Sequence, residues 1–189
     1  MFGFKQDTAK KIPFLSLLTA LLFSCVLSGC ATPPQNSENQ RAAYARVQVA
    51  LGYLQQRQYE AAKQSLDKAL QHSPDYYLPY LVLAHYYQQI GNVNQAESHY
   101  LLALDKDSQQ GDSHNNYGAF LCQQGRFSDA FSHFDTALAS PDYYRLAQTY
   151  ENTALCAHQA GDRSRLNAAL ERLRHIDVRQ AQQLAELLR

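Results

Sequence analysis

The sequence predicts an all-α protein, a superhelical solenoid of about four helical hairpins with a C-terminal capping helix. Few residues interrupt helices, because the 189-residue chain contains only 8 Gly and 6 Pro. Small residues also recur with a period of about 34 residues. This agreement between consecutive units is typical of stacked hairpins. The small residues of the first three units are Ala50, Ala62 and Ala69; Ala84, Ala96 and Ala103; Gly118, Ala130 and Ala137.

The first element, residues 1–29, has the composition of an export signal. Three lysines precede an almost uncharged apolar stretch at 12–27, which is short for a membrane span. The stretch ends in Leu27-Ser28-Gly29-Cys30, which resembles the lipobox of bacterial lipoproteins. The resemblance implies cleavage before Cys30 and acylation of its thiol and of the new N-terminus. The alternative is an uncleaved anchor with an incidental cysteine.

The second element, residues 30–42, is expected to be the lipidated Cys30 followed by a flexible tether. Two prolines and polar residues without an apolar period favour a tether. In lipoproteins of this kind an Asp after the cysteine retains the protein in the inner membrane, and Ala31 stands there instead. The resemblance therefore implies a lipid anchor in the outer membrane, facing the periplasm. Each buried methylene adds roughly 0.8 kcal/mol, so three acyl chains would hold the protein permanently.

The remaining elements are the repeats, at about 43–76, 77–110, 111–144 and 147–176, and a cap at 177–189. Antiparallel helices approach closely where one presents a small side chain opposite a large one. Leu66, Tyr100 and Phe134 supply the large side chain in the first three units, and Gly91 and Gly125 mark turns. This pattern resembles the tetratricopeptide repeat. The second helix of the fourth unit is expected to be degenerate, because leucines replace the alanines.

The first helices of such repeats line a concave face that binds peptides or helices. On this face the sequence predicts a polar but uncharged groove for a protein partner. The candidate residues are Leu51, Leu54, Leu81, His85, Gln88, Gln89, Asn115, Asn116, Ala119, Gln123, Glu151, Asn152 and His158.

The cysteines outside the signal and the lipid site are Cys122 and Cys156. An oxidising compartment would permit a disulfide between them. Their apolar helical contexts favour buried free thiols, and the sequence does not fix the Cα separation that a bridge requires. A zinc site formed with His158 would lack a fourth ligand and the usual spacing.

Composition and motifs argue against other functions. The formal net charge of +0 and the pI near 7.0 provide no basic face for nucleic acid. No phosphate-binding loop, serine elbow or His-Glu-x-x-His motif is present. We therefore expect neither enzymatic activity nor a cofactor, a metal or a small-molecule substrate.

Three segments narrow the resemblance. They are NNYGAFLCQQGRF at 115–127, YENTALCA at 150–157 followed by Gly161-Asp162, and LGYL at 51–54. The sequence resembles the type IV pilus biogenesis/stability lipoproteins, the pilotins of the pilus secretin. This implies binding to secretin subunits and assistance in assembling their outer-membrane ring. The alternative is a general periplasmic scaffold that organises envelope enzymes such as peptidoglycan hydrolases.

Overall fold

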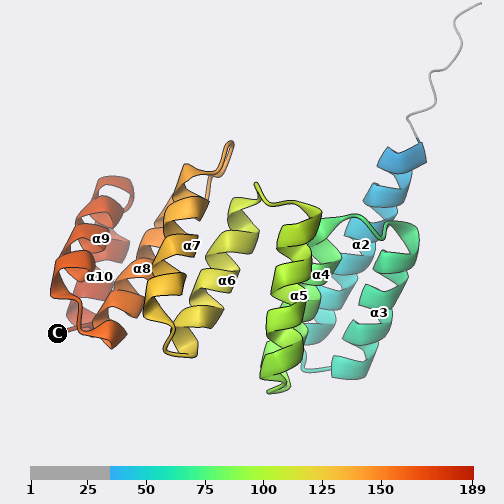
Figure 1. The fold of residues 1–189 in the computed structure, drawn as a ribbon, viewed down its shortest axis with the longest axis horizontal. Coiled ribbons are helices and arrows are strands. Elements are labelled where there is room, and N and C mark those ends of the chain that lie inside the picture. Colours follow the sequence, from blue (N-terminus) through green and yellow to red (C-terminus); the bar gives the residue numbers. More distant parts are fainter. Residues whose placement is uncertain (1–34) are drawn as a thin grey trace, which may run out of the picture. The chain divides into compact units, whose positions relative to one another are not determined.

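The computed structural model describes residues 35–189, and every regular element in this range is a helix (Figure 1). The all-α prediction is confirmed. The predicted signal and the lipidation of Cys30 lie outside the described residues. The helices are α2 (Gln35–Gln55), α3 (Tyr59–His72), α4 (Tyr77–Gln89), α5 (Val93–Lys106), α6 (Gly111–Gln123), α7 (Phe127–Ala139), α8 (Leu146–Ala160), α9 (Arg163–Ile176) and α10 (Val178–Leu187).

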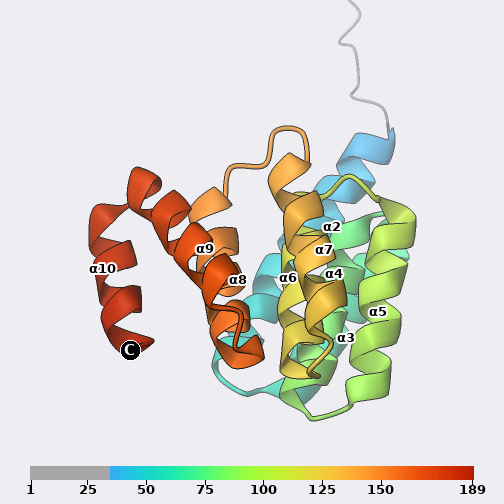
Figure 2. The same ribbon diagram turned by 60° about the vertical axis from the view of Figure 1, so that its left-hand side comes forward.

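Consecutive helices form the hairpins α2/α3, α4/α5, α6/α7 and α8/α9, and α10 packs against α9 (Figures 1 and 2). The turns of the last three hairpins use the left-handed backbone of Gly91, Gly125 and Gly161, at φ of 76°, 76° and 72°. Arg57 occupies this conformation in the first hairpin, at φ 57°. The predicted turns at Gly91 and Gly125 are therefore confirmed.

The small residues at the helix crossings are buried, as the repeat pattern predicts. Ala96 and Ala103 have no exposed surface, and neither does Ala130. At Gly118 the approach is closest, because a Cβ atom there would lie 2.8 Å from the Phe134 ring. Helices α6 and α7 can therefore pack at this distance only where α6 has no side chain.

The core runs through the described helices as three clusters of buried residues. The first joins the α2/α3 hairpin to α4, the second extends from α4 to α8, and the third joins α8, α9 and α10. Leu78 and Tyr87 pack against both the first and the second cluster, and Leu166 packs against the second and third. The buried core of each hairpin is therefore continuous with that of its neighbours, as in other repeat proteins.

Two elements differ from the sequence prediction. Helix α2 begins at Gln35, inside the range 30–42 that was assigned to a flexible tether. Neither Gly nor Pro interrupts residues 35–51, so the helix that buries Ala43 and Val47 continues into polar sequence. In the fourth hairpin α9 is a full helix, because its buried Leu173 packs against Ala154 and Ala181 of the adjacent helices. Leu173 thus occupies the place that Ala69, Ala103 and Ala137 hold in the other repeats.

Candidate partner-binding surface

Eight of the predicted groove residues line two separate hollows. The first, here called the aromatic groove, includes Leu51, Leu81, His85 and Asn116, and its volume is about 370 Å³. The second, here called the disulfide groove, has a volume of about 300 Å³. Its predicted residues are Ala119, Gln123, Asn152 and His158.

Five tyrosines line the aromatic groove, and none of them was among the predicted residues. One of them, Tyr100 of α5, is buried. Tyr44 lies on α2, Tyr76 and Tyr77 lie at the start of α4, and Tyr144 precedes α8. The rings of Tyr76 and Tyr77 meet edge to face, with centroids 5.3 Å apart. Tyr144 is 78% exposed, so its ring is available to a partner.

The hydroxyls of Tyr76 and Tyr77 remain protonated donors near neutral pH. Burial raises the pKa of Tyr77 to about 12. Burial, followed by the charge of Tyr44, also raises the pKa of Tyr76. An ordinary tyrosine already titrates near ~10, so these shifts move ionisation further from physiological pH.

The charged groups of the aromatic groove compensate one another. Arg145 and Asp112 form an ion pair with an N–O distance of 3.5 Å. The side-chain nitrogen of Gln89 lies 2.8 Å from Nε2 of His85, and since an amide nitrogen only donates, Nε2 accepts. Desolvation lowers the pKa of His85, which also favours the neutral ring. The groove therefore has no net charge at neutral pH.

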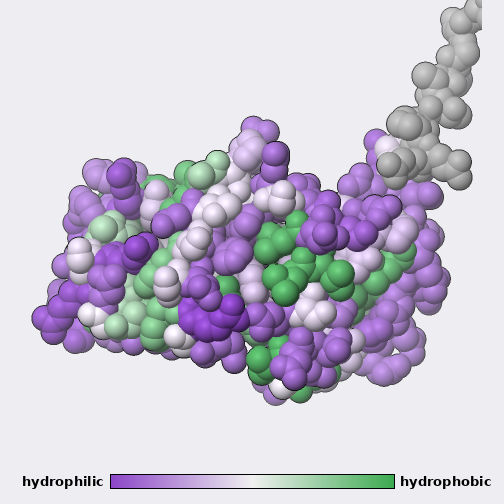
Figure 3. All heavy atoms as spheres, viewed as in Figure 1, coloured by the Kyte–Doolittle hydropathy of each residue, from purple (hydrophilic) through white to green (hydrophobic). Residues whose placement is uncertain are grey.

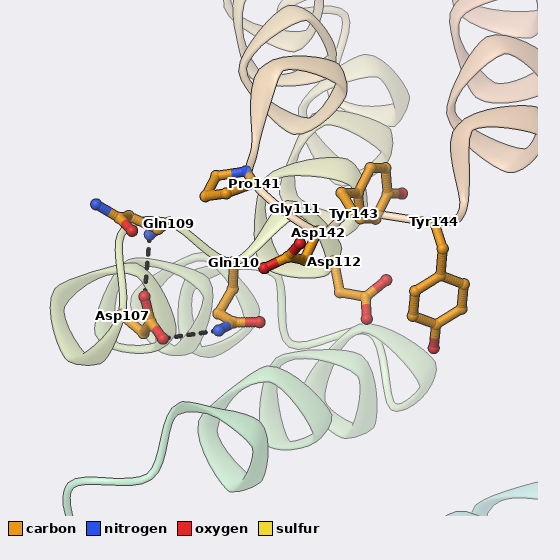
Figure 4. Close-up of a pocket in the computed structure, with 9 residues that line it drawn as sticks. All are labelled: Asp107, Gln109, Gln110, Gly111, Asp112, Pro141, Asp142, Tyr143 and Tyr144. Carbon is orange, nitrogen blue, oxygen red and sulfur yellow. Dashed lines mark hydrogen bonds between the residues drawn. The ribbon is translucent and has the colours of Figure 1, made fainter.

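A smaller hollow of about 290 Å³ beside the aromatic groove shows how Tyr144 is positioned (Figure 4). The ring of Tyr143 packs on Gly111, where a Cβ atom would lie 2.4 Å from the ring. The Tyr143 and Thr149 hydroxyls are 2.7 Å apart. These contacts hold the 140–145 segment, and Asp112 and Tyr144 point to the same side of it in Figure 4.

A disulfide between Cys122 of α6 and Cys156 of α8 lines the second groove. The expectation of free thiols is wrong, because the two Cα atoms lie 5.7 Å apart, within the range of disulfides. Both sulfur atoms are bonded, so they are not zinc ligands together with His158. Among the described residues no group of three His, Cys, Asp or Glu side chains is placed to hold a metal ion.

Gln88 forms a hydrogen bond with one residue of each groove. Its amide nitrogen donates to Oε1 of Gln123 at 2.6 Å, and its amide oxygen accepts from the Tyr100 hydroxyl at 2.9 Å. Gln88 was predicted to face a partner. Its side chain instead forms a bridge from α4 to α5 and α6.

Three other predicted groove residues are engaged within the fold. Leu54 and Asn115 are 3% and 1% exposed, and Asn115 accepts a hydrogen bond from Asn152. Glu151 accepts a hydrogen bond from Gln180 of the cap helix α10, at 2.7 Å. The groove prediction does not hold for Leu54 and Asn115, because side chains from adjacent helices cover them.

A second feature that was not predicted is a hydrophobic patch over α5, visible in Figure 3. Its residues do not line either groove. The exposed apolar residues on and beside α5 are Ile90, Val93, Leu101 and Leu102.

The hairpins, their crossings and their turns define a helical-repeat protein of the tetratricopeptide class. The family model described as "Tetratricopeptide repeat" matches residues 53–115. An uncharacterized protein of Haemophilus influenzae is 46% identical over 171 residues, covering 90% of this chain and 96% of that protein. The chain therefore belongs to the same family as this Haemophilus influenzae protein, and its residues 53–115 match the tetratricopeptide-repeat model.

The chain is also related to type IV pilus factors. The "Type IV pilus assembly protein PilF" of Pseudomonas aeruginosa is 33% identical over 144 residues, which cover 76% of this chain. The crystal structure of PilW, a "widely conserved type IV pilus biogenesis factor", matches with a TM-score of 0.67 and 29% identity over 71% of this chain. The chain spans 57% of the PilF sequence and 61% of the PilW structure.

None of the helices within residues 35–189 combines the length and the apolar character that crossing a membrane would require.

Proposed function

We propose that this protein is an outer-membrane lipoprotein, anchored through Cys30, that binds subunits of the type IV pilus secretin and promotes their assembly into the ring. It acts by binding alone and catalyses no reaction. The observation that carries the proposal is the 33% identity to PilF over 76% of the chain. The two grooves provide the surface that this function requires.

The grooves suit the capture of a protein segment. Ligand sites combine apolar and aromatic walls with a few placed polar groups. The aromatic groove has this composition, with Leu51 and Leu81 beside tyrosine hydroxyls. Lipidation at Cys30 would keep this surface at the inner leaflet of the outer membrane, where secretin subunits insert.

The test is the amount of detergent-resistant secretin multimer in a strain that lacks the chain. We expect secretin monomers in place of rings and a loss of surface pili, both restored by the wild-type gene. Cys30→Ala should not restore them, and the variant should leave the outer-membrane fraction while its repeats remain folded. Normal multimers in the deletion strain would contradict the proposal. An affinity purification that then recovers peptidoglycan hydrolases would establish the scaffold function instead.

A further inference from the structure

We propose that the aromatic groove binds a short, uncharged, proline-containing segment of the partner in the polyproline II conformation. The inference rests on the proposed function only in assuming a protein partner on this surface. It adds the chemical class of the segment, which the similarity to pilus factors does not specify.

The first argument is the concentration of accessible aromatic rings. Tyr44 and Tyr144 are 50% and 78% exposed, and both line the same groove as Tyr76 and Tyr77. They are the two tyrosines among the exposed large hydrophobic residues of the described part of the chain. Their position in one hollow indicates a site rather than incidental exposure. Aromatic-lined grooves bind proline-rich segments, whose conformation is largely formed before binding.

The second argument is the supply of hydrogen-bond donors. A polyproline II segment has no internal hydrogen bonds, so its carbonyl groups need donors from the surface that binds it. The raised pKa values of Tyr76 and Tyr77 keep their hydroxyls protonated, and the amide of Gln48 lines the same groove. A bound helix would already use its own carbonyls and leave these donors unpaired. Strand addition requires an exposed sheet edge, and the described residues contain no strand.

The third argument is charge. Arg145 is paired with Asp112, and His85 accepts a hydrogen bond from Gln89. The cation and the anion that line the groove are paired with each other, so the groove offers no net charge to an acidic or a basic segment. Moving an unpaired charge out of water is costly. The complementary segment is neutral.

The size of the site sets the length of the segment. A volume of about 370 Å³ is at the lower end of the range for ligand sites. One turn of polyproline II contains about 3 residues and rises ~9 Å. The groove therefore accommodates about one turn, and the flanking residues of the partner continue outside it.

The experiment uses the full lipidated chain in detergent and fluorescence anisotropy of a labelled octapeptide of alternating proline and alanine with blocked ends. There are three comparison peptides. In the first, every proline is replaced with alanine. In the other two, every second alanine is replaced with lysine or with glutamate. We expect saturable binding of the neutral proline peptide and at least tenfold weaker binding of each comparison peptide. Equal or tighter binding of the all-alanine or charged peptides would overturn the proposal.

The matched variants are Tyr144→Ala, Tyr144→Phe and Leu187→Ala. Leu187 is 75% exposed on α10 and outside the groove, so its truncation controls for the loss of an exposed apolar side chain. We expect Tyr144→Ala to weaken the proline peptide about tenfold, with Tyr144→Phe intermediate and Leu187→Ala unchanged. Melting temperatures of all three should match the wild type. Equal affinity of Tyr144→Ala and wild type would place the binding elsewhere and reject the inference.

The two proposals fail independently. If the proline peptide does not bind but the deletion strain loses secretin multimers, the inference falls and the secretin function stands. If the peptide binds while multimers form normally, the groove recognises proline segments of a different partner.

Discussion

The amide nitrogen of Asn152 donates a hydrogen bond to the side-chain oxygen of Asn115, at 3.0 Å, and thereby joins α8 to α6. Asn115 is 1% exposed, whereas Asn152 also lines the disulfide groove. The first asparagine of the segment 115–127 therefore connects two hairpins and does not face a partner.

The first prediction is that Asn115→Ala destabilises the fold. It leaves the half-buried amide of Asn152 without its acceptor, and losing such a hydrogen bond typically costs about 1 kcal/mol. The free energy of unfolding from urea titrations measures this. Asn116→Ala is the control, because the Asn116 amide donates to the Asp112 carbonyl of its own helix and is only partly buried. Equal losses for the two variants would contradict the assignment of a bridging role to Asn115.

The second prediction concerns the disulfide. Cys122 and Cys156 are 34 residues apart, and a loop of this length corresponds to roughly 3 to 4 kcal/mol of stabilisation in the chain-entropy model. Dithiothreitol should therefore lower the urea midpoint of the wild-type protein. The double variant Cys122→Ala/Cys156→Ala should start at the lower midpoint and not respond to dithiothreitol. A wild-type midpoint that is the same with and without reductant would refute the prediction.

The third prediction compares two glycines in helices. Gly118→Ala would place a methyl group 2.8 Å from the Phe134 ring and 3.1 Å from the Ala130 carbonyl oxygen. Such overpacking typically costs about 1 to 3 kcal/mol. No atom lies within 4 Å of a Cβ at Gly52, so Gly52→Ala should stabilise α2 by up to ~1 kcal/mol. Thermal unfolding measures whether Gly118→Ala is destabilised and Gly52→Ala stabilised. A stabilised Gly118→Ala variant would show that α6 and α7 are further apart than the structure places them.

The fourth prediction is a loss of stability at acidic pH through His133. Nε2 of His114 lies 3.0 Å from the Ser108 carbonyl oxygen and donates to it, so its Nδ1 accepts from Nδ1 of His133 at 2.9 Å. Burial is the largest cause that lowers the pKa of His133, and the charge of His114 is the second. The charge of Asp129 raises this pKa, and the charge of Arg126 lowers it further. An unfolded histidine titrates near ~6.5, so the unfolded chain binds this proton first as the pH falls. The contribution of neutral His133 to the free energy of unfolding is therefore complete above about pH 6.5 and declines below it.

The measurement for this fourth prediction is the melting temperature from pH 7.5 to 5.5. We expect it to fall by a few degrees, in part because His85 and His99 have pKa values lowered in the same direction. His133→Gln should reduce the slope, whereas substitution of the exposed His158 should not. An unchanged slope in His133→Gln would exclude this histidine as a source of the pH dependence.

The sequence predicts those parts of the fold that repeat. Ala96 and Ala130 are recognisable because each crossing places a small residue at the same step of the period, and Gly91 and Gly125 because the turns need a left-handed residue. These contacts lie within one hairpin or between neighbours. They depend on local spacing, which a single sequence displays.

The sequence predicts the binding surface less well. Tyr76 and Tyr144 lie at the last positions of the first and third repeats, where the repeat pattern specifies no residue type, and a two-residue offset follows Tyr144. The position of a residue in the repeat also does not show whether an adjacent helix covers its side chain. Asn115 is an example, because α8 covers it. The adjacent pairs Tyr76-Tyr77 and Tyr143-Tyr144, in a chain with 13 Tyr and no Trp, were the available signal.

The covalent link between α6 and α8 also determines how the repeats open. In a stack of repeats local unfolding begins at the ends, and each hairpin can open separately from distant ones. The Cys122–Cys156 bond removes this independence for the third and fourth hairpins. Amide protons of α6 and α8 should therefore exchange with deuterium as one cooperative unit, while those of α10 exchange earlier.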